Sequence, residues 1–146
     1  MYRNLIQYLS LSLTTCFLMG CVNLPAPALA VPNANQVNRV VVIDQEIITQ
    51  TRNPEAVSKV ITDPEQIANI LDFLRNHNDG WYTRLDTFPS SRFTISFYQG
   101  DRHMMVVWFS NEWLGGRNGG QESRDNREKK LTPEETEMFK QLLGIK

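Results

Sequence analysis

The side chains in this chain best suited to acid–base chemistry are a histidine and three carboxylates, namely His103, Asp101, Asp44 and Glu46. His103 lies two positions after Asp101 at the start of an expected strand, and a histidine near a carboxylate is a typical general base. Asp44 and Glu46 are two apart on another expected strand, so both side chains would point to one face. A small hydrolase using these groups is one hypothesis. A stacked pair of His103 with Tyr98 is its structural alternative.

Residues 111–130 form a long polar segment, which we interpret as a loop. Its run Gly-Gly-Arg-Asn-Gly-Gly at 115–120 lacks the Lys-Ser or Lys-Thr ending of a phosphate-binding loop, so a flexible loop is the preferred interpretation. Trp113 is a candidate binding residue as an exposed apolar contact, or it pins the loop to the core. Arg117 is the second candidate, because it belongs to a basic cluster suited to anionic lipid headgroups.

The remaining composition argues against several classes of protein. The 15 Lys and Arg residues nearly cancel the 16 Asp and Glu residues, which does not favour nucleic-acid binding. The histidines, His77 and His103, lie far apart and show no metal-ligand spacing. Cys16 and Cys21 are the only cysteines, and both lie near the N-terminus. We therefore expect no metal, no cofactor and no disulfide in the domain.

The N-terminal residues have the organisation of an export signal. Arg3 supplies positive charge, and residues 5–19 form an apolar run that several Ser, Thr and Gln residues interrupt. This run is shorter and more polar than the roughly 20 apolar residues that a membrane-spanning helix needs. It therefore predicts a signal peptide rather than a permanent membrane anchor.

The end of that run, Leu18-Met19-Gly20-Cys21, resembles the lipobox of bacterial lipoprotein precursors, with a less usual Met19. The resemblance covers only the signal segment. It implies cleavage before Cys21, lipid on the Cys21 thiol and attachment to the cell membrane or outer envelope. On this interpretation residues 1–20 are the signal peptide, 21–38 a flexible tether, and 39–146 one folded domain.

A second cleavage site competes with the first. Ala28-Leu29-Ala30 satisfies the small-residue rule of ordinary secretion. A cut after Ala30 would start the mature chain at Val31, discard Cys21 and release a periplasmic or secreted protein.

Two helices have clear start signals. Asp63 is a suitable N-cap, Pro64 occupies the first helical position and Gln66 has capping-box spacing, so a helix is expected from 63 to about 76. Thr132, Pro133 and Glu135 repeat this pattern, and Gly144 is the expected C-cap of the second helix.

Strands are expected at 40–49 with a bulge near 44–46, at 57–61, at 81–85, at 92–99 and at 103–109. Gly100-Asp101 predicts a two-residue hairpin turn between the last two. That turn would place Phe93, Ile95, Phe97, Met104, Val106 and Trp108 on the core face.

The order of elements is β-(β)-α-(β)-β-β-α, where parentheses mark weaker strands. The fold class predicted is α+β, a small antiparallel sheet of 3–5 strands with two helices packed on one face. We expect an exported, lipid-anchored, non-catalytic binding module with an envelope protein as partner. Three alternatives stay open: a secreted protein cut after Ala30, a small envelope hydrolase using His103, and an inhibitor or immunity-type module.

Overall fold

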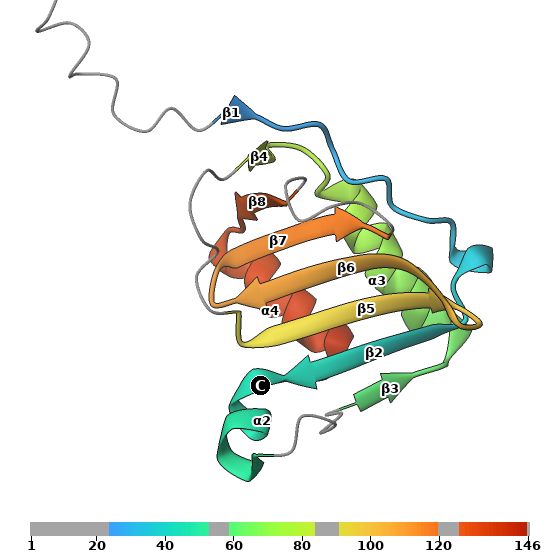
Figure 1. The fold of residues 1–146 in the computed structure, drawn as a ribbon. Coiled ribbons are helices and arrows are strands. Elements are labelled where there is room, and N and C mark those ends of the chain that lie inside the picture. The colour runs from blue at the N-terminus through green and yellow to red at the C-terminus, as the bar shows by residue number, and fades with distance from the viewer. Residues whose placement is uncertain (1–23, 53–58, 84–90, 120–125, 146) are drawn as a thin grey trace, which may run out of the picture.

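The computed structural model describes residues 24–52, 59–83, 91–119 and 126–145 (Figure 1). Its centre is an eight-stranded antiparallel sheet in the order β1-β4-β8-β7-β6-β5-β2-β3. The strands are β1 (Leu24–Pro25), β2 (Arg39–Asp44), β3 (Lys59–Ile61), β4 (Tyr82–Thr83), β5 (Phe93–Gln99), β6 (Arg102–Ser110), β7 (Trp113–Asn118) and β8 (Arg127–Lys130). The helical segments are η1 (Ala34–Gln36), α2 (Gln45–Thr51), α3 (Pro64–Asn76) and α4 (Pro133–Leu143).

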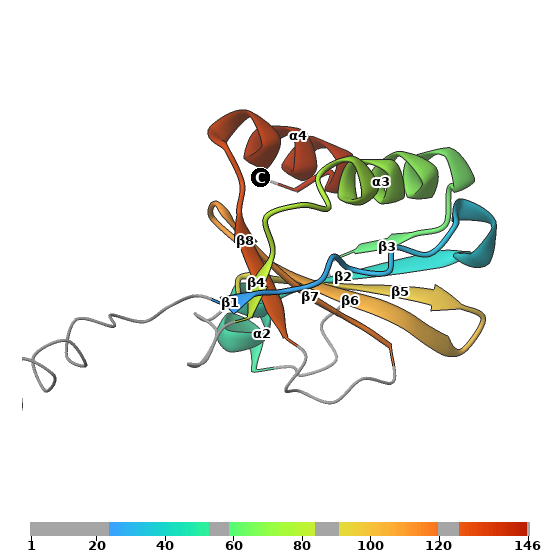
Figure 2. The ribbon, with the colours of Figure 1, turned by 90° about the horizontal axis from the view of Figure 1, so that it is seen from above.

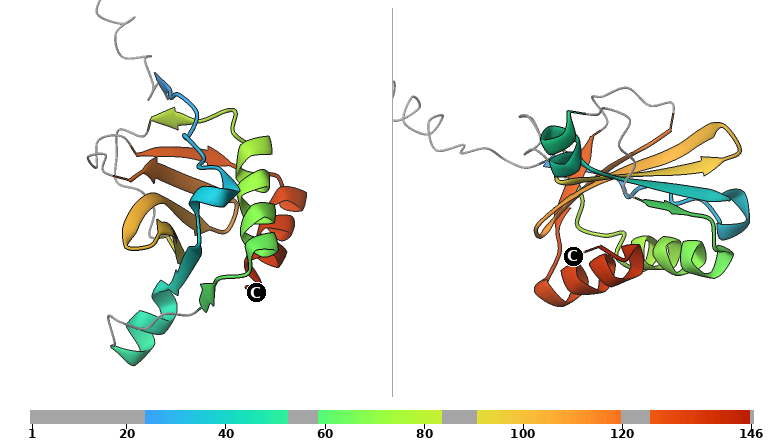
Figure 3. Two further views of the ribbon diagram at one scale, coloured as in Figure 1. Left: turned by 90° about the vertical axis from the view of Figure 1, so that its right-hand side faces the viewer. Right: turned by 90° about the horizontal axis from the view of Figure 1, so that it is seen from below.

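Helices α3 and α4 lie side by side on one face of the sheet, as Figure 2 shows. Between them and the strands lies a continuous apolar core. Phe139 of α4 stacks on Phe73 of α3 at 4.9 Å and meets Phe109 of β6 edge-on at 5.3 Å. The other face of the sheet carries neither of these helices, and α2 lies beyond the end of β2 (Figures 2 and 3).

The predicted fold class of 3–5 strands with two helices is wrong. The described residues form eight strands and three α-helices. Strands β7 and β8 come from residues 113–118 and 127–130, inside the segment that we interpreted as a loop. The expected continuation of the first strand to residue 49 is instead helix α2, because the Asp44 side chain accepts a hydrogen bond from the backbone N–H of Glu46 and caps a helix there.

The two predicted helices are confirmed. Helix α3 follows the N-cap Asp63 and ends at Asn76, and α4 has the complete capping box of Thr132 and Glu135 with Gly144 as its left-handed C-cap. The Gln66 side chain does not complete the capping box that its spacing from Asp63 predicted. Its side chain donates to the carbonyl oxygen of Leu142 at 2.7 Å and thereby ties α3 to the end of α4.

The hairpin turn at residues 100–101 is confirmed, but the register beyond it shifts. Tyr98 pairs with His103 as predicted, whereas Phe97 pairs with Met105 across a bulge. The core face of β6 therefore consists of Met105, Val107 and Phe109, not the expected Met104, Val106 and Trp108. One extra residue in the bulge is enough to turn every later side chain to the opposite face.

Residues 24–38 lie against the domain, although the sequence interpretation assigned them to a flexible tether. We call this segment the N-terminal strap. It crosses the helix-bearing side of the sheet next to α3 (Figure 2), and Leu29 and Val37 are buried in the core. A Cβ atom on Gly116 of β7 would lie 2.7 Å from a methyl carbon of Leu29, so the glycine leaves the space that Leu29 fills.

Two asparagine side chains hold the backbone of the strap. The Asn78 amide accepts a hydrogen bond from the N–H of Leu29 at 3.0 Å and donates one to the Leu29 carbonyl at 2.8 Å. The Asn118 amide pairs in the same way with the N–H and carbonyl of Ala30, at 3.2 and 2.6 Å. Arg127 also donates to the carbonyl of Ala28 at 2.6 Å. The strap is therefore held in a defined register by directional bonds.

Candidate functional site

Aromatic and cationic side chains gather on the sheet face that α3 and α4 leave open. Strand pairing places partners on a common face: Arg39 pairs with Tyr98, Tyr98 with His103, and Trp113 with Lys130. We define the aromatic–cationic face by eight residues: Arg39, Tyr82, Tyr98, His103, Trp108, Trp113, Arg117 and Lys130.

One half of this face is a ladder that runs across β2, β5, β6 and β7. The Arg39 guanidinium lies 4.8 Å from the centre of the Tyr98 ring, and that ring lies 5.2 Å from the His103 ring. Arg117 lies 5.6 Å from the centre of the Trp108 ring. No ion pair found among the described residues involves Arg39 or Arg117. Arg39 also donates a hydrogen bond to the carbonyl oxygen of Gly100 at 3.2 Å, and a guanidinium group suits the recognition of a carboxylate.

The other half lies toward β4 and β8. The Tyr82 and Trp113 rings meet edge to face with centroids 6.4 Å apart, and the Lys130 ammonium lies 6.0 Å from the Trp113 ring. Lys130 also forms an ion pair with Glu112 at 2.9 Å.

The two binding candidates, Trp113 and Arg117, lie on the regular strand β7 and not on a loop. Their side chains point to the same face, about 13 Å apart along the strand.

His103 lacks the surroundings of a general base. Burial, followed by the positive charge of Arg117, lowers the pKa of His103 below its usual value, so the ring favours its neutral form. Its ring contact is Tyr98, and Asp101 is exposed in the adjoining turn. The structure does not place a described carboxylate in contact with this imidazole.

The Asp44 and Glu46 pair has a structural role. Glu46 belongs to α2 rather than to a strand, and Asp44 caps that helix. Arg92 lies 3.5 Å from a carboxylate oxygen of each residue. Asp44 pairs with Phe93 at one end of β5, whereas His103 pairs with Tyr98 at the other, about 17 Å along the strand and on the opposite face. The structure therefore does not bring the candidate acid–base groups together.

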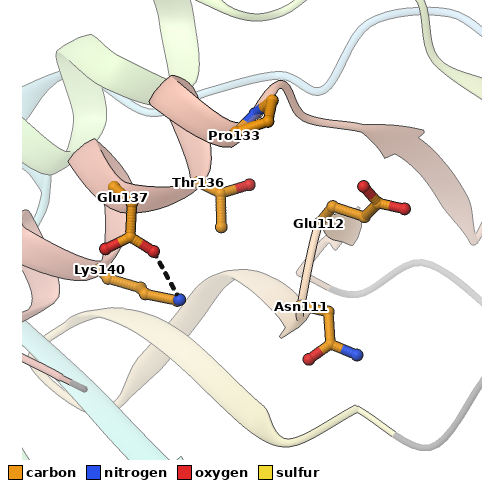
Figure 4. A pocket seen from close by; sticks show the side chains of 6 residues that line it. All are labelled: Asn111, Glu112, Pro133, Thr136, Glu137 and Lys140. Atoms are coloured by element: carbon orange, nitrogen blue, oxygen red, sulfur yellow. Dashed lines mark hydrogen bonds and ion pairs between the residues drawn. The ribbon is translucent and has the colours of Figure 1, made fainter.

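The described surface includes an open pocket of about 320 Å³ between the start of α4 and the turn from β6 to β7 (Figure 4). Six residues line it: Asn111, Glu112, Pro133, Thr136, Glu137 and Lys140. The Lys140 ammonium forms an ion pair with the Glu137 carboxylate at 2.7 Å. The buried Thr136 hydroxyl has no hydrogen-bond partner. A nucleophilic hydroxyl needs a hydrogen bond to a base, and neither described carboxylate of the pocket, Glu112 or Glu137, makes one with Thr136.

Sequence reasoning missed the charged strand β8, whose Arg127, Glu128 and Lys129 are buried. The Lys129 ammonium donates to the carbonyl of His77 at 2.7 Å and to the carboxylate of Asp79 at 3.3 Å. This contact lowers the pKa of Asp79, mainly through the hydrogen bond from Lys129 and then through its charge. Residues 127–130 belong to the polar segment that we interpreted as a loop, because mixed charge is typical of a solvated surface.

The lipidation candidate Cys21 lies outside the described residues. Within the described ranges, no three His, Cys, Asp or Glu side chains lie close enough together to hold a metal ion. In the same part of the chain, no helix is both long and apolar enough to cross a bilayer. No family model, curated protein or solved structure matches this chain.

Proposed function

We propose that this protein is an exported lipoprotein, anchored in the cell envelope through lipid on Cys21, and that its folded domain is a non-catalytic binding module. The observation that carries the anchor is the burial of Leu29, of which only 3% is exposed. A cut after Ala30 would remove Leu29 together with β1 and the backbone groups that Asn78, Asn118 and Arg127 bind. Cleavage before Cys21 keeps all of these residues in the mature protein.

The anchor is tested by the intact mass of the protein purified from membranes of a bacterial host. We expect an N-terminus at Cys21 with two or three acyl chains, and loss of the acyl mass in Cys21→Ser. As a matched control, Ala30→Leu blocks the alternative cut, and it should leave the N-terminus at Cys21, the number of acyl chains and the membrane attachment unchanged. A mature chain that begins at Val31 would overturn the proposal.

The binding role is supported by the ladder half of the aromatic–cationic face. Arg117 and Arg39 there stack on aromatic rings, which holds their charge in position for an acidic envelope protein. Arg117→Glu should abolish capture of such a partner from envelope extract. Arg102→Glu makes the same charge change at an exposed residue next to the hairpin turn, and it should leave capture intact. Equal capture by both variants would remove this face from the proposed function.

A further inference from the structure

The strap presents an apolar surface at the point where the chain leaves the fold toward Cys21. Residues 24–32 contain no polar side chain. Leu29 and Pro32 point inward and are buried, whereas Leu24, Pro25, Pro27, Ala28 and Ala30 are exposed. A continuous exposed apolar stretch on a folded protein is typical of an interaction surface.

The length of chain between this surface and the lipid is short. Only residues 22 and 23 separate Cys21 from β1. Three Cα–Cα steps span at most about 11 Å, whatever path they take. A lipid on Cys21 would therefore hold β1 within that distance of the membrane surface, which is comparable to the thickness of a headgroup layer.

The residues next to β1 suit the same environment. Pro25 pairs with Tyr82, whose ring contacts Trp113 edge to face. Tyrosine and tryptophan concentrate at membrane interfaces because each combines an apolar ring with a polar atom. Pro25 has no backbone N–H, so β1 is a poor edge for pairing with a strand of a second copy.

We propose that the exposed side of residues 24–28, together with Tyr82 and Trp113, lies in the headgroup layer of the membrane that holds the lipid. We call this surface the membrane edge. The inference rests on the proposed lipidation of Cys21. The opposite edge of the sheet, β3, is seven strand spacings away, roughly 30 Å, and points away from the bilayer. The ladder half of the aromatic–cationic face then remains free for a protein partner.

Two single-cysteine variants of the full-length protein test this placement. Lipid blocks Cys21 and the signal peptide carries Cys16, so a new cysteine is the one free thiol of the mature protein. Ala28→Cys lies on the membrane edge. Val60→Cys lies on β3, where the side chain is 52% exposed, and it serves as the control. Each is labelled with a polarity-sensitive fluorophore and reconstituted in vesicles of phosphatidylethanolamine and phosphatidylglycerol with a nitroxide on the headgroup.

We expect a blue shift and nitroxide quenching at position 28 and neither at position 60. A flexible Gly/Ser insertion of 20 residues between Asn23 and Leu24 should abolish both signals while the acyl mass persists. Equal signals at the two positions in a lipidated protein would overturn the membrane edge and leave the anchor standing. A blue shift without nitroxide quenching, together with a doubled mass in detergent, would assign the surface to a second copy and also overturn it. Absence of acyl mass would instead overturn the proposed function.

Discussion

The sheet has two halves that are held together in different ways. Strands β2, β3, β5 and β6 form an apolar half, whose inward side chains, such as Val40, Ile95 and Val107, are fully buried under the helices. Strands β1, β4, β7 and β8 with the strap form a polar half. Three of these four strands are only two to four residues long. Hydrogen bonds of the Asn78, Asn118 and Arg127 side chains hold the backbone of the strap at residues 28–30.

The difference shows what each half can tolerate. Apolar burial has no direction, so the apolar half accommodates a bulge between β5 and β6 without loss of its core. The hydrogen bonds of the polar half are directional, and each one requires a specific backbone N–H or carbonyl group of the strap. Its structure therefore depends on a segment that comes before β2 in the chain. On the proposed processing, cleavage before Cys21 would keep the whole segment, whereas a cut after Ala30 would remove residues 24–30 of it.

The largest expected effect comes from removing the first part of the strap. A chain that begins at Val31 loses Leu29, worth about 2–5 kcal/mol by analogy with large-to-small core substitutions, and several hydrogen bonds at about 1 kcal/mol each. We expect a loss of roughly 5 kcal/mol or more in the free energy of unfolding, measured by urea denaturation against a chain that begins at Leu24. This approaches the whole stability of a typical domain.

The control for this truncation is a chain that begins at Val22, which should match the one that begins at Leu24. If the chain from Val31 unfolds at the same urea concentration as both, the polar half does not depend on the strap. The two halves would then not differ in this respect, and a cut after Ala30 would be compatible with a stable domain.

The second effect concerns the contact between Leu29 and Gly116. A Cβ at position 116 would lie 2.7 Å from a Leu29 methyl carbon and 3.3 Å from the Val106 carbonyl oxygen. Gly116→Ala should cost about 1–3 kcal/mol through overpacking. In the background of Leu29→Ala most of that cost should vanish, because the crowded methyl group is gone. A double-mutant cycle measures the coupling, expected at about 0.5–3 kcal/mol. Additive effects would show that Gly116 is needed for another reason.

This contact also explains why the sequence did not reveal β7. Glycine disfavours strands, and Gly115 and Gly116 follow Trp113 in a stretch that reads as a loop. A glycine is needed at position 116 because Leu29 packs against it. Leu29 lies far away in the chain, so no local sequence pattern predicts this contact. Sequence reasoning succeeds where the signal is local, as at the caps of α3 and α4 and at the turn of residues 100–101.

In the candidate site, too, the residue types could be read from the sequence, whereas their arrangement depends on strand pairing. Trp113 and Arg117 were predicted as binding residues from their types alone, and the structure adds that they share a face with Tyr98 and Trp108. The bulge near His103 decides which residues of β6 join them, because it sends Trp108 outward and Phe109 inward. A bulge depends on how two strands pair, so an alternating apolar pattern in one strand does not show it.

The third effect compares the two asparagine side chains. Asn78 is partly buried, binds both backbone groups of Leu29 and accepts a hydrogen bond from the Trp81 indole at 2.9 Å. Asn118 is also half-buried and binds both backbone groups of Ala30, but these two hydrogen bonds lie in an exposed setting because Ala30 is exposed. Asn78→Ala should therefore cost about 2–3 kcal/mol and Asn118→Ala about 1 kcal/mol in thermal or urea denaturation. A reversed order would mean that the exposed end of the strap is its principal attachment.

The smallest effect is the pH dependence of the contact between Lys129 and Asp79. Lys129 lowers the pKa of Asp79 in the folded state, so the ionised carboxylate favours folding. This contribution is present above the ordinary Asp79 pKa of 3.8 and is lost as the pH falls through the lower folded-state value. Asp79→Asn should lower stability slightly near neutral pH and make the loss of stability below about pH 4 less steep. The effect is small because solvent screens an exposed carboxylate.

Urea midpoints measured from neutral to acid pH test this dependence. Lys129→Met removes the cation from the buried side of β8, and in that background Asp79→Asn should no longer change the slope. If Asp79→Asn changes the slope equally in both backgrounds, then Lys129 acts through the His77 carbonyl alone. The ion pair would then add nothing to the attachment of the polar half, and the pH dependence due to Asp79 would come from its other neighbours, its own backbone group and His77.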